Sequence, residues 1–207
     1  MRILNLYAGI GGNRKLWEDV DVTAVEWNEE IARVYSDNFP NDKVIVADAH
    51  QYLLDHYTEF DFIWASPPCP THSRARFWGW SKKKPIYPDV KLYQEITLLR
   101  HHFNSKYVVE NVVPYYAPWI APCASIGRHL FWANFKIGKF KIKSTIKLHT
   151  AGRRQYEKEY GFDLSGYNIE RKDRKLRNCV HPETGNHILD RAKNITKKTN
   201  TEQMNLF

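Results

Sequence analysis

The sequence predicts an α/β domain built around a mainly parallel sheet. Short apolar runs alternate with helical patterns through roughly the first half of the chain, which is typical of parallel strands joined by crossover helices. A glycine-rich turn follows the first run at Gly9, and Glu26, Asp48, Cys69 and Glu110 each follow a later run. Because ligands bind at the carboxyl ends of parallel strands, these residues predict a site at that edge of the sheet.

The expected elements follow in chain order. Apolar runs predict strands over 3–7, 22–25, 44–46, 60–65 and 107–109. Helical spacing predicts helices over 13–19, 28–38, 51–56 and 90–103, with Asn28 as the cap of the second helix and Pro40 as its stop. After Pro114 the alternation fades: residues 130–132 and 135–142 indicate β structure, 182–193 a last helix, and the residues beyond Thr196 a mobile tail.

Charge is unevenly distributed along the 207 residues, whose net charge is +8. Residues 1–135 carry 14 Lys and Arg against 15 Asp and Glu, whereas residues 136–198 carry 17 against 7. This asymmetry fits one face that meets a polyanion such as nucleic acid. It equally fits a solvated lysine-rich surface.

Composition excludes several classes. No apolar run reaches the roughly 20 residues that span a bilayer, and no signal peptide precedes the first strand, so we expect a cytoplasmic protein without a membrane partner. The three cysteines are widely spaced, without a CxxC pair. They therefore indicate neither a disulfide framework nor a zinc site, and no metal is expected.

The glycine turn and two acids suggest a cofactor site. Residues 7–12 lie between a strand and the next element, where glycines let a ligand approach the backbone closely. Glu26 is placed to bind ribose hydroxyls, and Asp48 to accept a bond from an adenine amino group. Tight packing of the glycines, and helix capping by either acid, remain open as alternatives.

Cys69 and Glu110 are the candidates for chemistry. Cys69 lies in a loop fixed by three prolines, near two arginines and a lysine run, and positive charge lowers a thiol pKa and favours the thiolate. Glu110 follows an apolar strand, where desolvation keeps a carboxyl protonated as an acid. A buried inert cysteine and a surface carboxylate are the alternatives. The basic and aromatic loop over 71–88 is long enough to suggest function.

Together these residues resemble the DNA (cytosine-5) methyltransferase family, in its small phage or bacterial form with a truncated target-recognition region. The resemblance runs through six segments in the family's order, from residue 3 to about residue 192. They are residues 5–12, Glu26-Trp27, Asp48, Ser66-Pro67-Pro68-Cys69 with Ser73, Glu110-Asn111-Val112, and Asn178-Cys179-Val180-His181-Pro182.

The resemblance implies a class I S-adenosylmethionine-dependent methyltransferase, with a Rossmann-like sheet and a small basic C-terminal extension, acting on cytosine in DNA. It implies a catalytic and cofactor-binding domain over 1–135, a nucleic-acid-contacting region over 136–177, a C-terminal helix over 178–195 that closes back, and a tail over 196–207. The cofactor-binding residues would be Tyr7, Gly9, Gly11, Gly12, Glu26, Trp27, Asp48, Pro68, Asn178 and Val180, and the catalytic ones Cys69, Glu110, Arg128 and His129. The nucleic-acid-binding residues would be Ser73, Arg74, Arg76, Lys82, Lys83, Lys84, Arg153 and Arg154.

Two departures from the family pattern affect these expectations. Arg128-His129 stands where the family usually has two arginines separated by one residue, so either side chain is a candidate for contacting the base. Only 43 residues separate Asn134 from Asn178, where the family inserts its recognition domain. Sequence selectivity then comes from a very small element or from a partner, or it is weak.

Alternatives to this function stay open. They are the same reaction on RNA, a catalytically silent nucleic-acid-binding protein of the same fold, and a nicotinamide oxidoreductase, which the lack of GxGxxG spacing disfavours. A restriction-modification setting and a monomer are expected. The last five residues resemble a peptide bound by bacterial sliding clamps, with Gln203 at the rim and Leu206 and Phe207 in an apolar pocket. The alternative is that they tuck back against the domain, or match by chance.

Overall fold

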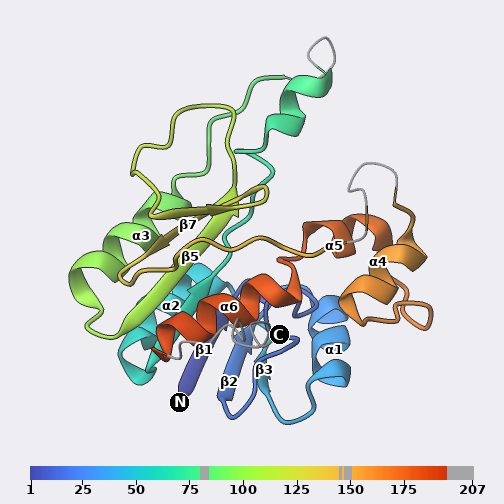
Figure 1. The fold of residues 1–207 in the computed structure, drawn as a ribbon, viewed down its shortest axis with the longest axis horizontal. Coiled ribbons are helices and arrows are strands. Elements are labelled where there is room, and N and C mark those ends of the chain that lie inside the picture. The colour runs from blue at the N-terminus through green and yellow to red at the C-terminus, as the bar shows by residue number, and fades with distance from the viewer. Residues whose placement is uncertain (80–83, 145, 147–150, 195–207) are drawn as a thin grey trace, which may run out of the picture.

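A seven-stranded sheet forms the centre of the computed structural model, which describes residues 1–79, 84–144, 146 and 151–194 (Figure 1). The strand order is β3-β2-β1-β4-β5-β7-β6. The strands are β1 (Arg2–Leu6), β2 (Asp21–Val25), β3 (Lys43–Ile45), β4 (Phe62–Ala65), β5 (Lys106–Val112), β6 (Ala124–Ile126) and β7 (His129–Ala133).

Pairing is parallel from β3 to β5 and antiparallel at the far edge. Leu6 lies in register with Val25 of β2 and Ala65 of β4, so these strands end together at one edge of the sheet. β7 pairs antiparallel with β5 and β6, with Glu110 opposite Phe131. The sheet confirms the predicted α/β class. Gly9, Glu26 and Cys69 follow the ends of β1, β2 and β4, and Glu110 lies within β5, one residue beyond its last pair with β4.

Helices cover both faces of the sheet. On one side α2 (Ala49–His56) and α3 (Lys91–His102) pack against Leu4 and Leu6 of β1. On the other, α6 (Pro182–Ala192) packs against Ile3 of β1, and α1 (Glu29–Asn38) packs against Ala24 of β2. This two-sided burial follows from the pleat, which sends alternate residues of each strand to opposite faces.

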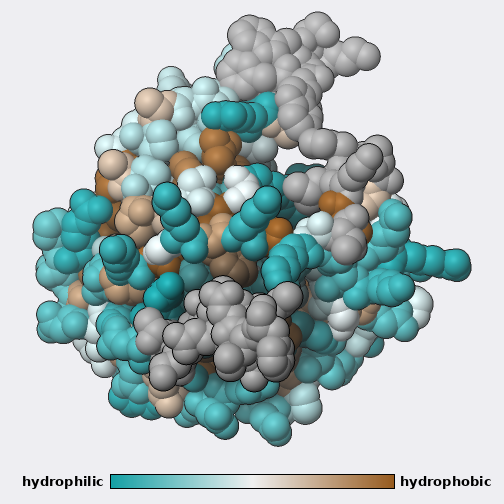
Figure 2. All heavy atoms as spheres, viewed as in Figure 1, coloured by the Kyte–Doolittle hydropathy of each residue, from teal (hydrophilic) through white to brown (hydrophobic). Residues whose placement is uncertain are grey.

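The basic C-terminal region shares its core with the rest of the chain. Helices α4 (Arg153–Tyr160) and α5 (Lys172–Asn178) lie beside α1 at one end of the sheet (Figure 1). Tyr156 and Phe162 enter the same buried cluster as Tyr35 and Phe39. Hydrophilic side chains cover the outside of this corner (Figure 2). Neither helix was predicted, because their polar composition gives a weak hydrophobic pattern.

Two local predictions were wrong. Residues 13–19 form successive turns instead of a helix: the backbone N–H groups of Arg14 and Trp17 bond to carbonyls three residues back, and Asp19 has a positive φ of 54°. Close packing explains this, because a Cβ on Gly185 of α6 would lie 2.1 Å from the Asn13 carbonyl oxygen. Residues 135–142 contain no strand, although Ile137 is buried in the core.

Some expectations concern residues outside the described ranges. Lys82 and Lys83, and the tail residues Gln203, Leu206 and Phe207, are among them. Two short 3₁₀ helices complete the described elements, η1 (Tyr57–Glu59) and η2 (Arg74–Gly79). Within the described ranges, no helix is both long and apolar enough to cross a membrane.

Candidate active site

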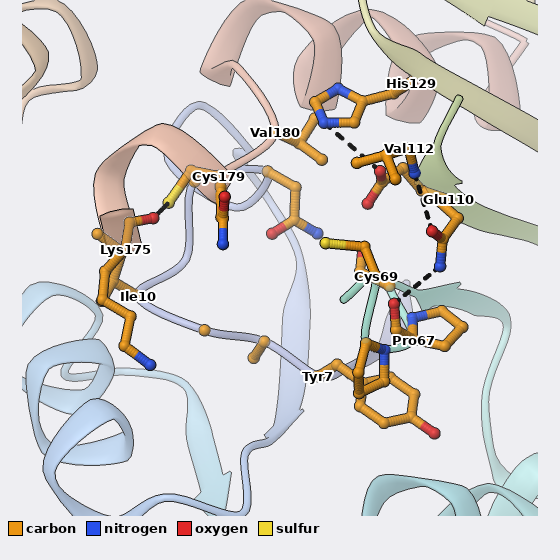
Figure 3. A pocket seen from close by; sticks show the side chains of 18 of the residues that line it. Tyr7, Ile10, Pro67, Cys69, Glu110, Val112, His129, Lys175, Cys179 and Val180 are labelled. Carbon is orange, nitrogen blue, oxygen red and sulfur yellow. Dashed lines mark hydrogen bonds and ion pairs between the residues drawn. The ribbon is translucent and has the colours of Figure 1, made fainter. Parts of the chain in front are cut away.

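A cavity of about 260 Å³ opens at the carboxyl ends of β1, β2, β4 and β5 (Figure 3). It is enclosed on the remaining side by the connection between α5 and α6. Twelve of the predicted site residues line it: Tyr7, Gly9, Gly12, Glu26, Trp27, Pro68, Cys69, Glu110, Arg128, His129, Asn178 and Val180. The fold therefore brings together residues that are up to 173 positions apart in the sequence.

The glycines of the first turn have different roles. Gly9 has a φ of +57° and faces the cavity, where a Cβ would meet only the Tyr7 carbonyl oxygen, at 4.0 Å. Gly11 does not line the cavity, because a Cβ there would lie 2.2 Å from the Phe39 ring. Gly11 therefore packs against Phe39, whereas Gly9 leaves room for a ligand.

The Glu26 carboxylate binds the backbone of the glycine turn at the cavity. Its carboxylate oxygens accept hydrogen bonds from the backbone N–H groups of Gly9 and Asn28, each at 3.0 Å. Burial raises the pKa of Glu26, and these backbone bonds oppose the rise. Each carboxylate oxygen has two acceptor sites, so lone pairs remain for hydroxyl groups of a ligand.

A second hollow of about 440 Å³ adjoins the first and shares Tyr7, Trp27 and Pro68 with it. Trp27 is 72% exposed, which leaves its ring available to a flat ligand at the rim. Asp48 also lines this hollow, but one of its oxygens caps α2 by accepting from the His50 backbone N–H at 2.8 Å. Its other oxygen lies 3.6 Å from the Lys91 ammonium. Asp48 is thus a helix cap beside the hollow, as the capping alternative predicted.

The loop that carries Cys69 is held by its neighbours on β4 and β5. The Asn111 side-chain amide donates to the Pro67 carbonyl at 2.9 Å, and the Trp64 indole donates to the Ser66 hydroxyl at 2.9 Å. The Cys69 sulfur points into the cavity (Figure 3). A fixed loop with an inward thiol can present a nucleophile to a bound ring.

The Cys69 thiol is not activated by the neighbours that its sequence suggested. Burial raises its pKa, and the Glu110 carboxylate adds to the rise, while Arg128 opposes it. Arg74 and Arg76 instead donate to the carbonyls of Pro114 and Lys84. The prediction that nearby positive charge lowers the pKa of Cys69 is therefore wrong, because the effect of burial outweighs that of the charge.

Glu110 has the properties of a proton donor. Its side chain is buried, and burial raises the pKa of Glu110 to about 7. His129 Nε2 lies 3.6 Å from a Glu110 carboxyl oxygen. Burial lowers the pKa of His129 to about 3, so this imidazole is neutral near pH 7. Glu110 is therefore partly protonated at neutral pH, and the neighbouring His129 imidazole carries no charge.

The two candidates at Arg128-His129 separate in space. His129 lies beside Glu110 at the cavity (Figure 3), whereas the Arg128 guanidinium donates to the carbonyl oxygen of Arg177 near the end of α5. Arg128 thus joins β7 to the segment that carries Asn178 and Val180. Both side chains line the cavity, where His129 adjoins Glu110 and Arg128 is bound to the end of α5.

The expected nucleic-acid-binding residues fall in two places. Ser73 forms a β-bridge with Pro114 next to the Cys69 loop, where Arg74 and Lys84 are exposed and Arg76 is half-buried. Arg153 and Arg154 lie on α4, at the corner beside α1, and Arg153 is 3.4 Å from Glu157. In Figure 1 the segment that begins with η2 lies well apart from α4.

Several lining residues escaped sequence reasoning. Lys175 of α5, Cys179 directly after α5, and Ile31 of α1 also line the cavity. Cys179 packs against Gly12, where a Cβ would lie 2.6 Å from the Cys179 Cβ, and burial raises the pKa of its thiol to about 12. Asn13 also lines the cavity, and its side-chain amide donates to Asn5 Oδ1 at 2.8 Å. The available signal for Cys179 was its place between Asn178 and Val180, which the resemblance assigns to the cofactor site.

The raised pKa of Cys69 predicts slow alkylation of the free protein. The rate of Cys69 modification by iodoacetamide should reach half its maximum above pH 9.0, the ordinary thiol pKa. Glu110→Gln should shift this midpoint downward, because it removes the second cause of the rise. Mass spectrometry of each cysteine peptide resolves Cys69 from Cys123 and Cys179, and a wild-type midpoint below 9.0 would contradict the burial argument.

Comparisons with known proteins place this site in a family. Among solved structures, a mutant of Spodoptera frugiperda DNMT2 is similar with 27% identity over 54% of this chain and 35% of that chain, at a TM-score of 0.39. The SAM-dependent methyltransferase from Agrobacterium tumefaciens matches at 14% identity over 56% of this chain and 40% of that one, with a TM-score of 0.39. The Entamoeba histolytica methyltransferase EhMeth matches at 17% identity over 54% and 38%, with a TM-score of 0.36.

These structural similarities are partial, and the chain corresponds to about a third of the DNMT2 chain. No curated protein sequence matches it. The family model for the C-5 cytosine-specific DNA methylase matches residues 1–113, more than half of the chain, and includes the glycine turn, Glu26, Cys69 and Glu110. The chain therefore belongs to the C-5 cytosine-specific DNA methylase family.

Proposed function

We propose that this protein transfers a methyl group from S-adenosylmethionine to carbon-5 of cytosine in DNA, through a covalent adduct with Cys69. The observation that carries the proposal is one cavity in which the Cys69 thiol and the buried Glu110 carboxyl face the glycine turn and Glu26. Such a site can hold a nucleophile, a proton donor and a methyl donor within reach of one base. A silent binding protein would have no need of this combination.

The residues present fit the cofactor. The open space above Gly9, the remaining lone pairs of Glu26 and the exposed ring of Trp27 suit an amino acid chain, a ribose and an adenine respectively. When bound, S-adenosylmethionine supplies an electrophilic methyl group. Tyr7, Gly12, Pro68, Asn178 and Val180 would complete the enclosure around it.

The protein's own groups would activate the base. Cytosine carbon-5 is a poor nucleophile, so the Cys69 thiolate adds to carbon-6 while the Glu110 proton passes to ring nitrogen 3. The electrons of the 5,6 double bond then make an enamine, which renders carbon-5 nucleophilic. After methyl transfer, the carbon-5 proton passes to water, the Cys69 thiolate is eliminated as the 5,6 double bond reforms, and the proton on ring nitrogen 3 returns to Glu110, which restores the aromatic ring and the acid. His129, neutral and beside Glu110, would orient that carboxyl.

Access to the ring requires base flipping. A stacked cytosine cannot reach the Cys69 sulfur, and extrusion costs a few kcal/mol. Two groups of basic residues, Arg74 with Lys84 and Arg153 with Arg154, would bind phosphates of the DNA that carries the extruded base.

Glu26→Ala should weaken S-adenosylmethionine binding by ~1–3 kcal/mol, because it removes charge-assisted bonds to the ribose and loosens the turn at Gly9. Isothermal titration calorimetry measures the affinity. Glu30→Ala is a matched control, since Glu30 is an exposed acid on α1 whose partner is Arg33. Equal affinities of the Glu26→Ala protein and the wild type would remove Glu26 from the cofactor site.

Sequencing of modified cytosines tests the reaction and the polymer together. DNA and RNA from cells that express the protein should be compared with those from cells that express Cys69→Ser. We expect Cys69-dependent 5-methylcytosine in DNA, at a short or degenerate site, because the helices that follow β7 before Asn178, α4 and α5, share the core beside α1 within the described residues. Methylation confined to RNA would replace the DNA assignment, and methylation of neither polymer would contradict the proposed reaction.

A further inference from the structure

We propose that the exposed face of Trp119 is a stacking site for a nucleobase of the substrate DNA, beside the base that enters the cavity. The proposal rests on the proposed function and adds a recognition residue outside the segments that the family resemblance covers. Trp119 belongs to the connection between β5 and β6 and is 58% exposed.

The Trp119 ring is held in place from beneath. It stacks on buried Tyr93 of α3, with ring centroids 4.6 Å apart and an interplanar angle of 25°. Tyr116 flanks it at 5.9 Å, and the Trp119 backbone N–H donates to the Tyr93 hydroxyl at 3.3 Å. One face of the indole is thus occupied by Tyr93, and the ring is still mostly exposed. A preorganised aromatic ring of this kind loses little conformational entropy when a base stacks on it.

A chain of hydrogen bonds ties this ring to the nucleophile loop. The Tyr93 hydroxyl donates to the Tyr116 hydroxyl at 3.3 Å, and Tyr116 lies 2.6 Å from His72 Nδ1. His72 is buried, and its backbone N–H donates to the Cys69 carbonyl at 3.0 Å. Burial lowers the pKa of His72, so the link is made by a neutral ring. A base stacked on Trp119 would therefore be fixed relative to Cys69.

Two further backbone contacts strengthen this connection. The Tyr115 N–H donates to the His72 carbonyl at 3.0 Å, and Ser73 forms its β-bridge with Pro114. Pro114, Tyr115 and Tyr116 are thus each bound to the loop after Cys69.

Positive charge beside the same segment favours nucleic acid as the occupant. The Arg74 side chain is exposed and uses Nε to donate to the Pro114 carbonyl at 3.2 Å, which leaves its terminal nitrogens for other acceptors. Lys84 is exposed on the neighbouring segment, where Arg76 donates to its carbonyl at 3.0 Å. An aromatic face beside cations that can bind phosphates is the combination that single bases and backbones bind. A protein segment on Trp119 would leave these cations without phosphate partners.

Photochemical cross-linking tests the contact directly. The full chain is mixed with a random-sequence duplex 30-mer of DNA that carries 5-iodouracil in place of thymine, irradiated, and digested for mass spectrometry. We expect a cross-linked peptide that contains Trp119. Cross-links confined to other residues in a wild-type protein that binds this DNA would overturn the proposal.

Affinity measurements with matched variants complete the test. Fluorescence anisotropy with the same duplex should show about tenfold weaker binding for Trp119→Ala and little change for Trp119→Phe, which keeps a stacking ring. Leu54→Ala is the control, because Leu54 on α2 is 53% exposed and lies outside both basic groups. Wild-type affinity in Trp119→Ala would overturn the proposal, as would equal losses in Trp119→Ala and Leu54→Ala.

The two proposals fail differently. If the wild type binds neither this DNA nor the corresponding RNA, the proposed function fails before Trp119 is tested. If DNA binding and Cys69-dependent methylation are present but Trp119→Ala changes neither affinity nor cross-linking, only the stacking site fails. S-adenosylmethionine affinity, measured by calorimetry, should stay the same in Trp119→Ala, since Trp119 lies outside the residues that line the cavity. If that affinity is lost through misfolding, the wild-type cross-link still decides the question.

Discussion

Cys69→Ser should lower the rate of methyl transfer to DNA by roughly 10³-fold or more while leaving S-adenosylmethionine affinity almost unchanged. A serine hydroxyl is a far weaker nucleophile than a thiolate, so the addition at carbon-6 fails. The glycine turn, Glu26 and Trp27, which form the proposed cofactor site, do not depend on this sulfur. Transfer of a radioactive methyl group measures the rate, and calorimetry measures the affinity.

A second cysteine provides the control for this variant. Cys123 is exposed and does not line the cavity, so Cys123→Ser should retain the wild-type rate. Wild-type turnover in Cys69→Ser would refute covalent catalysis by this residue. Loss of activity in both variants would show that the assay reports damage to the protein instead of loss of the nucleophile.

Glu110→Gln should lower kcat/KM for DNA by about 10²- to 10⁴-fold, because a glutamine cannot transfer a proton to ring nitrogen 3. It should also change the pH profile. The active form needs Cys69 ionised and Glu110 protonated, and the pKa of Glu110 is about 7 whereas that of Cys69 is raised above its ordinary value. In the wild type, kcat/KM should therefore rise with pH and level off near pH 7, where the growing thiolate fraction is offset by loss of the Glu110 proton.

The variant lacks the group that causes this change of slope. Its kcat/KM should keep rising through pH 7 until Cys69 is fully ionised. Circular dichroism and cofactor affinity should match those of the wild type, as a check that the buried amide is tolerated. If the slope of kcat/KM against pH changed near pH 7 in both proteins, another group would titrate there and Glu110 would not be the acid.

The positions of the site residues could be predicted because strand ends are visible in the sequence. Gly9, Glu26, Cys69 and Glu110 each follow an apolar run, and parallel strands bring their carboxyl ends to one edge. Fold class therefore followed from the pattern of elements alone. The environment of each side chain did not, because it depends on contacts between segments far apart in the chain.

Cys69 shows this difference most clearly. Its sequence neighbours Arg74 and Arg76 bond to the backbone carbonyls of Pro114 and Lys84. The groups that shift its pKa are Glu110 and Arg128, which are 41 and 59 positions away, together with burial itself. The direction of the shift was predicted incorrectly because local charge was visible in the sequence and burial was not.

Other features were missed because their causes are tertiary. The turns over 13–19 follow from the close approach of Gly185. The different surroundings of Arg128 and His129 became visible only through the hydrogen bond between Arg128 and the Arg177 carbonyl. Helices α4 and α5 are mostly polar, and few of their side chains, Tyr156 and Tyr160 of α4 and Leu176 of α5, enter the cluster shared with α1. Trp119 stood out only when its stack on Tyr93 was seen.

The central claim, covalent activation of cytosine by Cys69, can be tested by trapping the adduct. The protein is incubated with S-adenosylmethionine and duplex DNA in which all cytosines of one strand carry fluorine at carbon-5. After methyl transfer no proton remains at carbon-5 to be removed, so the thiolate cannot leave and the protein stays bound to the DNA. We expect a denaturation-resistant complex whose digestion yields a Cys69 peptide carrying a methylated fluorocytosine nucleotide, absent in Cys69→Ser. A wild-type protein that methylates ordinary DNA but forms no such complex, or forms it through another residue, would contradict the account.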